Sequence, residues 1–180
     1  WRLPVGRGRK LLSALPALGE QVLGGWELIG LGYVQSGEWF TPNFTGVDTS
    51  NTSAIGGRPD RIRDGNLPPG ERRIDRWYDI GAFAVPPSGR FGNSARNILR
   101  GPGLRVFHLG IGKDFRLLAY HGEGVKLHFE AAMQNVLNHP SFANPSATLG
   151  AATNGVISAM ANRLEEPGPR FMEMRLRVTF

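Results

Sequence analysis

The last eleven residues, RFMEMRLRVTF (170–180), alternate strictly between two kinds of side chain. Apolar side chains take every second position: Met172, Met174, Leu176, Val178 and Phe180. Polar or charged side chains take the positions between them: Glu173, Arg175, Arg177 and Thr179. Because successive side chains of a β-strand point to opposite faces, this segment predicts a strand with one apolar face and one charged face.

Three further segments favour strands: residues 26–40, 107–116 and 125–137. The alternation is nearly perfect over 125–134 of the last of these, and in 107–116 it is interrupted by Lys113, which falls in an otherwise apolar row. The clearest strands are about 9–11 residues long, which is the length that a tilted strand needs to cross the hydrocarbon of a membrane. A soluble sheet would show the same alternation, so the pattern by itself favours a membrane barrel only modestly.

Helices have little room in this chain, which holds 25 glycines and 13 prolines. We expect short helices near 11–15 and 18–23, separated by Pro16. The longest stretch without a charged residue, 131–162, contains several asparagines and prolines, so no helix is expected to span a bilayer. If the protein lies in a membrane, it must cross as strands of a closed barrel, because nothing else satisfies the backbone in lipid.

The segments between the predicted strands differ strongly in length. Residues 41–103 and 138–169 are long and irregular, whereas 6–25 and 119–124 are shorter connections. When the strands are placed across a membrane in turn, the two long loops fall on the same side, which is typical of outer-membrane barrels. A short additional strand is expected at 155–160 within the second loop.

Several phrases of the sequence resemble one family. They are LGGWELIGLGYVQSGEWFTP (23–42), RPDRI (58–62), DRWYDIGAFAVPPSGRFGNSARNILRGPGL (75–104) and FEAAMQNVLNHPSFANP (129–145). In this order they are similar to the C-terminal barrel region of TonB-dependent outer-membrane receptors, of the type with a carboxypeptidase-regulatory-like N-terminal domain and an Oar-like barrel. The resemblance covers essentially the whole chain.

The resemblance implies an all-β fold, in which antiparallel transmembrane strands form the last part of a barrel of roughly 22 strands with long extracellular loops. Residues 1–180 would be a C-terminal fragment with four complete strands and the end of a fifth. The parent would lie in the bacterial outer membrane and import a scarce small ligand, energised by TonB through an N-terminal part outside this chain.

The same resemblance implies roles for the last strand. Met172, Met174, Leu176 and Val178 would face outer-membrane lipid, and Phe180 would be the signal read by the barrel assembly machinery. Arginine and glutamate at the intervening positions would face a wet lumen, where charge is tolerated.

The long loop 41–103 contains the best candidates for ligand binding: Arg72, Arg73, Arg76, Trp77 and Tyr78. Guanidinium groups and aromatic rings offer bidentate donors and stacking surfaces to an anionic or sugar-like ligand. The competing interpretation is that arginine–aspartate pairs, using Asp60, Asp64, Asp75 and Asp79, hold the loop together.

Other chemistry finds little support in the sequence. His108 and His128, with Asp114 and Glu130, could approach one another on neighbouring strands, but filling of a polar lumen explains them better than a metal site. No catalytic constellation stands out, so we expect no enzyme and no cofactor.

The formal charge of +6 comes from residues scattered along the chain, and we therefore expect no nucleic-acid partner. The alternative function is a soluble β-rich module that binds carbohydrate or nucleic acid. In that case the apolar row of the last strand should be sealed inside a core.

Overall fold

The computed structural model describes residues 1–120, 123–161 and 168–180. The chain divides into two compact units: unit 1 comprises Trp1–Tyr33, Arg105–His139 and Pro167–Phe180, and unit 2 comprises Val34–Leu104 and Pro140–Glu166. Residues 121–122 of the predicted turn and 162–167 of the predicted second loop lie outside the described residues.

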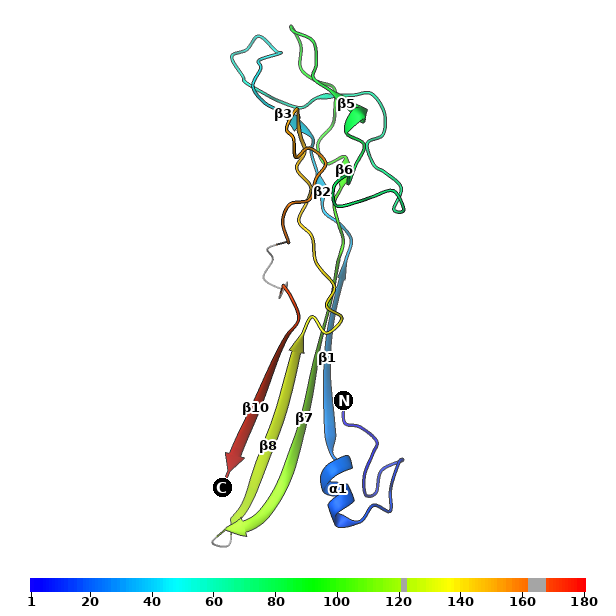
Figure 1. Cartoon of the computed structure of the whole chain (residues 1–180), viewed down its shortest axis with the longest axis vertical. Helices are drawn as coiled ribbons and strands as arrows, with labels where there is room; N and C mark the ends of the chain where they lie inside the picture. The colour runs from blue at the N-terminus through cyan, green and yellow to red at the C-terminus, as the bar shows by residue number, and fades with distance from the viewer. Residues whose placement is uncertain (121–122, 162–167) are drawn as a thin grey trace. The chain divides into compact units, whose positions relative to one another are not determined.

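Unit 1 is built on a four-stranded sheet with the order β1-β7-β8-β10 (Figure 1). Its strands are β1 (Trp26–Gln35), β7 (Leu104–Tyr120), β8 (Glu123–Gln134) and β10 (Phe171–Thr179). Both β7 and β10 pair with β8 in antiparallel fashion. The N-terminal residues add to the other edge, since Leu3 N donates to Trp26 O at 2.9 Å and Leu28 N donates to Trp1 O at 2.7 Å.

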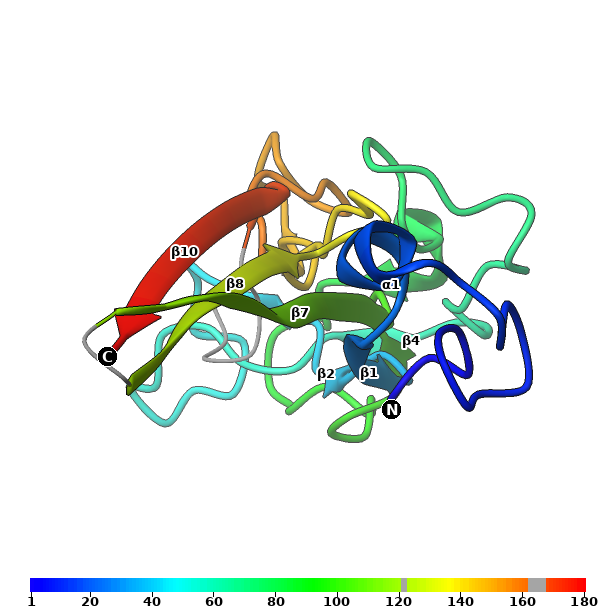
Figure 2. The ribbon, with the colours of Figure 1, turned by 90° about the horizontal axis from the view of Figure 1, so that it is seen from below.

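One short helix, α1 (Ala17–Leu23), precedes β1 and confirms the prediction for 18–23. The helix expected at 11–15 does not form. Leu12 has a φ of 56°, which a right-handed helix excludes, and Leu11 N instead donates to Pro4 O at 2.9 Å. Seen from below, α1 lies beside β7 near the start of β1 (Figure 2). None of the helices among the described residues is long and apolar enough to cross a membrane.

The strand boundaries differ from the predicted ones for identifiable reasons. The predicted strand 26–40 is broken after Gln35 and resumes as β2 (Trp39–Phe40). Between them Gly37 packs so closely on the backbone of Gly101 that a side chain there would overlap the carbonyl oxygen. β8 ends at Gln134 rather than at 137, because Asn135 has a φ of 46° and turns the chain. β7 extends beyond the predicted 107–116 at both ends.

Unit 2 is assembled from the two long segments that the sequence presents as irregular loops. It contains three two-stranded pairs: β2 with β6 (Leu99–Arg100), β3 (Asn43–Phe44) with β9 (Thr148–Leu149), and β4 (Asp60–Arg61) with β5 (Phe83–Ala84). The 3-10 helix η1 (Ile80–Ala82) leads into β5. The pair of β3 and β9 is parallel and joins the first long segment to the second.

The two long segments share one small core, so they form a packed unit. The buried residues Tyr78, Ala82, Phe83 and Leu99 form the cluster, and Phe40, Ile98 and Leu149 pack against it. Backbone hydrogen bonds also cross between the segments, as Trp77 N donates to Gly155 O and Ile157 N donates to Ile74 O, both at 2.8 Å. The strand expected at 155–160 does not form, and only Met160 makes a single bridge, to Phe142.

Candidate functional sites

The register of the sheet gathers apolar side chains from three strands onto one face, here called face A. Its cross-strand rows are Leu109–Met133–Met172, Ile111–Ala131–Met174, Lys113–Phe129–Leu176 and Phe115–Leu127–Val178. β1 continues this face, because the ring of Trp26 meets that of Phe129 edge-on at 6.1 Å. Lys113 is the one charged residue in these four rows.

The apolar side chains of β10 on face A are open to the surroundings. Met172, Met174, Leu176 and Val178 are each at least half exposed, with Leu176 at 69%. A soluble sandwich would bury this row under a second layer, since sheets pack face to face to form a core. Phe180, which follows β10 by one residue, is 85% exposed.

The opposite face, here called face B, carries the charges. Its cross-strand rows are Gly110–Ala132–Glu173, Gly112–Glu130–Arg175, Asp114–His128–Arg177 and Arg116–Lys126–Thr179. Within these rows His128 Nδ1 lies 2.6 Å from Asp114 Oδ1, and Arg175 Nε donates to Glu173 Oε1 at 2.8 Å. Oppositely charged groups thus pair in part of the face, whereas Arg116 and Lys126 are neighbours of like charge.

The histidines that lie among the described residues do not come together as a metal site. Of the four residues considered, the structure brings His128 and Asp114 into contact, whereas His108 meets the ring of Tyr33 edge-on at 6.2 Å. Among the described residues, no group of three or more histidine, aspartate or glutamate side chains could hold a metal ion.

Lys113, the exception on face A, is covered by α1 and is only 2% exposed. Its Nζ donates to Gly24 O and, at 3.4 Å, to Glu20 O, so that the ammonium is bound at the C-terminal end of the helix. It also lies 5.4 Å from the centre of the Trp26 ring and 5.1 Å from that of Phe115. A cation is favourable there because the unpaired carbonyls give the end of the helix a partial negative charge.

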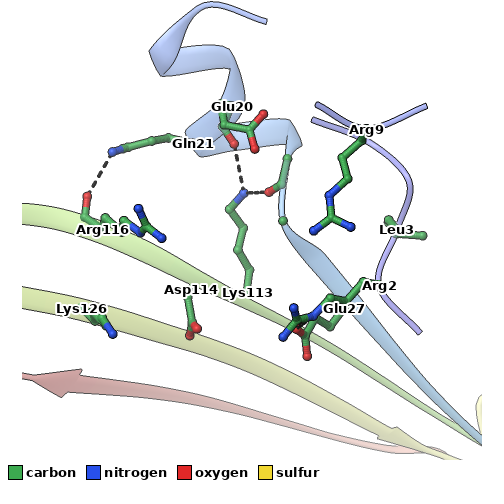
Figure 3. A pocket seen from close by; sticks show the side chains of 12 residues that line it. Arg2, Leu3, Arg9, Glu20, Gln21, Glu27, Lys113, Asp114, Arg116 and Lys126 are labelled. Carbon is green, nitrogen blue, oxygen red and sulfur yellow. Dashed lines mark hydrogen bonds and ion pairs between the residues drawn. The ribbon is translucent and has the colours of Figure 1, made fainter. Parts of the chain in front are cut away.

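A pocket of about 440 Å³ opens between α1, the N-terminal residues and the ends of β7 and β8 (Figure 3). Its charged lining is Arg2, Arg9, Glu20, Glu27, Lys113, Asp114, Arg116 and Lys126. Much of this charge is already paired, as Arg2 Nε lies 2.6 Å from Glu27 Oε1 and the Glu20 carboxylate accepts from Arg7 N at 2.6 Å. Gln21 Nε2 donates to Arg116 O at 3.0 Å and attaches the helix to the backbone of β7.

The predicted ligand-binding residues lie on one short stretch of unit 2. Arg73 and Arg76 face each other across a tight hairpin, in which each backbone N–H donates to the other residue's carbonyl oxygen at 3.0 and 3.1 Å. Both are exposed. Arg72 lies beside them with its guanidinium 5.8 Å from the centre of the Trp77 ring, and Trp77 Nε1 donates to Arg100 O at 2.8 Å.

The structure takes Tyr78 out of this set. Its side chain is 1% exposed, its ring packs between those of Phe40 and Phe83, and its hydroxyl donates to Asn154 Oδ1. Burial disfavours the phenolate and raises the pKa of Tyr78 to about 12. The ring therefore stabilises the core of unit 2 and is not available for stacking on a ligand.

Arginine–aspartate pairs do hold unit 2 together, as the competing interpretation predicted. Arg63 pairs with Asp79 at 2.7 Å, Arg61 with Asp64 at 3.3 Å, and Arg90 binds both carboxylate oxygens of Asp60. The hydrogen bonds from Arg90 hold the pKa of Asp60 below its ordinary value. For Asp60, Asp64 and Asp79 the interpretation is confirmed, and these pairs leave Arg72, Arg73 and Arg76 as a separate group.

Sequence reasoning did not find the contact between Lys113 and α1. The signal was present, because a single lysine in a row of apolar side chains needs a partner that removes the cost of its charge. The partners are backbone carbonyl oxygens of Glu20 and Gly24, and the identity of a residue does not indicate that its carbonyl is available.

Comparison with known families supports the architecture. A family model described as an outer membrane beta barrel domain matches residues 1–172. No curated protein and no solved structure matches the chain.

Proposed function

Since the chain belongs to the family of outer membrane β-barrel domains, we propose that it forms the last strands of a TonB-dependent receptor that imports a scarce ligand. The family places it in the bacterial outer membrane. Support for the receptor type comes from the resemblance of 23–42, 75–104 and 129–145 to the barrel region of such receptors, and from the long connections 36–103 and 135–170 between the strands of the sheet.

The observation that carries the proposal is the separation of apolar and charged side chains between the two faces of β7, β8 and β10. Face A would contact acyl chains, and face B would line a wet lumen. A charged side chain on the lipid face costs about 2–4 kcal/mol near the middle of the membrane, which explains why the charged residues of the cross-strand rows lie on face B, with Lys113 as the exception covered by α1. The soluble-module alternative fits poorly, because the Met172–Val178 row is exposed rather than sealed in a core.

The connections between the strands predict which end of the sheet faces the periplasm. The end of β7, the start of β8, α1 and the C-terminal residue Phe180 lie at one end of the sheet, here called the short-turn end (Figure 1). The connections between β1 and β7 and between β8 and β10 leave from the other end. Outer-membrane barrels keep short turns in the periplasm and long loops outside the cell, so the short-turn end would be periplasmic.

The partners follow from this placement. Phe180, exposed at the end of the last strand, would be read by the barrel assembly machinery. The four strands of the described sheet are fewer than the eight of the smallest barrels, so further strands and the contact with TonB would come from parts of the parent outside this chain.

The ligand would meet the arginines at 72–76 of unit 2, of which Arg73 and Arg76 are exposed. Arg72, Arg73 and Arg76, beside the ring of Trp77, would offer positive charge and a partly exposed aromatic surface. Such a surface suits an anionic chelate or a sugar with acidic groups, and this contact is part of the proposal.

A growth experiment tests the transport proposal. The full-length parent is made the only receptor of its kind in a host that is supplied with ferric chelates, cobalamin, maltodextrins or peptides as the limiting nutrient, with and without TonB. The proposal predicts growth on at least one nutrient that requires both the parent and TonB. Growth that needs the parent but not TonB would show a passive pore, and growth on none of these nutrients would also contradict the proposal.

A further inference from the structure

The segment before β1 exposes an unusual number of large apolar side chains. In residues 9–23, here called the anchor segment, these are Leu11, Leu12, Leu18, Val22 and Leu23. Leu18 is 81% exposed and Val22 63%, and as residues i and i+4 of α1 they point from the same side of the helix. An exposed apolar stripe of this kind is expected to contact another apolar surface.

The anchor segment is nevertheless held firmly. Gly6 N donates to Leu11 O at 3.0 Å, Arg7 Nε donates to Leu15 O at 2.7 Å, and the Glu20 carboxylate accepts from Arg7 N at 2.6 Å. These bonds close the loop before α1 onto the helix itself. The exposed leucines therefore belong to a segment whose conformation is held by hydrogen bonds.

The helix is attached to two residues of face A. Lys113, a face A residue, donates to the carbonyl oxygens of Gly24 and Glu20. Trp26, also on face A, donates from its indole Nε1 to Val22 O at 2.9 Å. The anchor segment is thus attached to residues of face A near the short-turn end of the sheet.

Basic residues accompany the leucines. Arg9 and Lys10 are exposed immediately before Leu11 and Leu12, and Glu20, the one acidic residue of the anchor segment, is turned toward Arg7 N. Exposed leucines beside exposed cations are the pattern of segments that lie in a membrane interface, with apolar side chains among acyl chains and cations at phosphate groups.

We propose that the anchor segment lies in the phospholipid headgroup region at the short-turn end of the barrel. Leu18 and Val22 would enter the acyl chains of the adjoining leaflet together with Leu11, and Arg9 and Lys10 would bind lipid phosphates. This inference rests on the proposed lipid contact of face A and adds a second contact with the same membrane. A protein partner or a second copy of the chain would compete for the same surface.

The test uses single cysteines, for which this chain offers a background free of cysteine. Leu18→Cys, Leu176→Cys and Thr179→Cys are made in the full-length protein, labelled with a polarity-sensitive dye and reconstituted in vesicles of phosphatidylcholine with or without phosphatidylglycerol. Leu176 reports face A and Thr179 reports face B. Before the fluorescence measurement, the folding of each sample is confirmed on a gel by comparing the migration of the unheated protein with that of the heat-denatured protein.

Three outcomes separate the two proposals. Blue-shifted emission and quenching by brominated lipid at positions 18 and 176, but not at 179, would support both. Lipid quenching at 176 together with water-like emission at 18 would overturn the anchor proposal and leave the barrel proposal intact. Lipid quenching at 176 together with a label at 18 that is shielded from water but not quenched by lipid would do the same, and would indicate a protein partner at the anchor segment. Absence of lipid quenching at both positions would overturn the anchor together with the lipid contact of face A.

The role of charge has its own variant, Arg9→Gln/Lys10→Gln, with Arg116→Gln/Lys126→Gln on face B as the matched control. In vesicles with phosphatidylglycerol, the first variant should lower the ratio of lipid-quenched to unquenched label at position 18 by about fivefold for each charge removed. The control should leave the ratio unchanged. An equal effect of both variants would contradict specific binding of phosphates by Arg9 and Lys10.

Discussion

The ammonium of Lys113 donates a hydrogen bond to the carbonyl oxygen of Gly24, the residue that caps the C-terminal end of α1. This contact explains how a lysine can occupy an apolar row on a face that is proposed to meet lipid. The carbonyls of a helix end replace the water that the ammonium loses, and the rings of Trp26 and Phe115 lie within cation–π distance of its Nζ. A short helix and one lysine thereby stabilise each other.

The first prediction concerns this contact. Lys113→Met keeps the bulk of the side chain and removes the donor, so α1 should keep only its attachment to β7 through Gln21. We expect amide hydrogen exchange of residues 17–24 to become about tenfold faster, which corresponds to the loss of roughly one hydrogen bond to a charged group. The control is Lys126→Met on face B, which should leave this exchange unchanged. Equal protection of α1 in both variants would contradict the role given to Lys113.

The second prediction compares the two faces of β10. Met174→Arg places a charge on face A and should lower the free energy of unfolding in lipid by about 2–4 kcal/mol. Arg175→Met, its neighbour on face B, should change that free energy much less, because its ion pair with Glu173 is exposed. Urea unfolding of the reconstituted full-length protein measures both. Similar losses for the two variants would show that the faces do not differ in environment.

The third prediction concerns the arginine hairpin of unit 2. Arg73→Ala/Arg76→Ala should weaken ligand uptake by the full receptor without unfolding unit 2, because both side chains are exposed. Arg73→Lys/Arg76→Lys should fall between the wild type and the alanine variant, since lysine keeps the charge but lacks the bidentate geometry. Arg96→Ala, an exposed arginine elsewhere in unit 2, is the control. Unchanged uptake and binding in the alanine variant would remove the hairpin from the ligand site.

The fourth prediction is an acid instability of unit 2. Hydrogen bonds from Arg90 hold the pKa of Asp60 below its ordinary value of 3.8, so its contribution is present at neutral pH and is lost as the pH falls through the lowered pKa. Asp60→Asn should therefore destabilise unit 2 at neutral pH and flatten its response to acid. Amide hydrogen exchange of residues 58–64 between neutral and acidic pH measures this, with the exposed Asp75→Asn as the control. An unaltered acid response in Asp60→Asn would contradict the assignment.

The fifth prediction concerns Tyr78 at alkaline pH. Because its pKa is raised from 10.0 to about 12, the buried neutral phenol stabilises unit 2 below pH 10, and this stabilisation is lost as the pH rises from 10 to 12. Ultraviolet difference spectroscopy should show one of the three tyrosines titrating late. In Tyr78→Phe the late phase should vanish, at a cost of about 1 kcal/mol for the lost hydrogen bond to Asn154. A late phase that survives in this variant would assign it to another tyrosine.

The long strands could be predicted from the sequence because their pattern has a simple period. Alternation in 125–134 and 171–179 fixes both the strand and the face of each side chain, and register then only has to align apolar with apolar. The exception, Lys113, could be seen in the sequence, but its partner could not, since carbonyl oxygens carry no residue signature.

Unit 2 could not be predicted for the opposite reason. Its strands are two residues long, which is too short to show any period, and its core joins Tyr78 to Leu149 across a long stretch of sequence. The same lack of signal led to Tyr78 being grouped with exposed arginines. Its neighbour Trp77 is only partly buried, and the burial of one aromatic ring and the exposure of the next depend on contacts that local sequence does not determine.

The measurement that tests the central claim most directly is a cysteine scan of β10 in the reconstituted full-length protein, with a label at each position from 172 to 179. If face A meets lipid and face B meets a wet lumen, brominated lipid should quench labels at the even positions and a water-soluble quencher should reach those at the odd positions. Labels at 172, 174, 176 and 178 that are shielded from both quenchers, or that are open to water alone, would contradict the assignment of this chain to the wall of a membrane barrel.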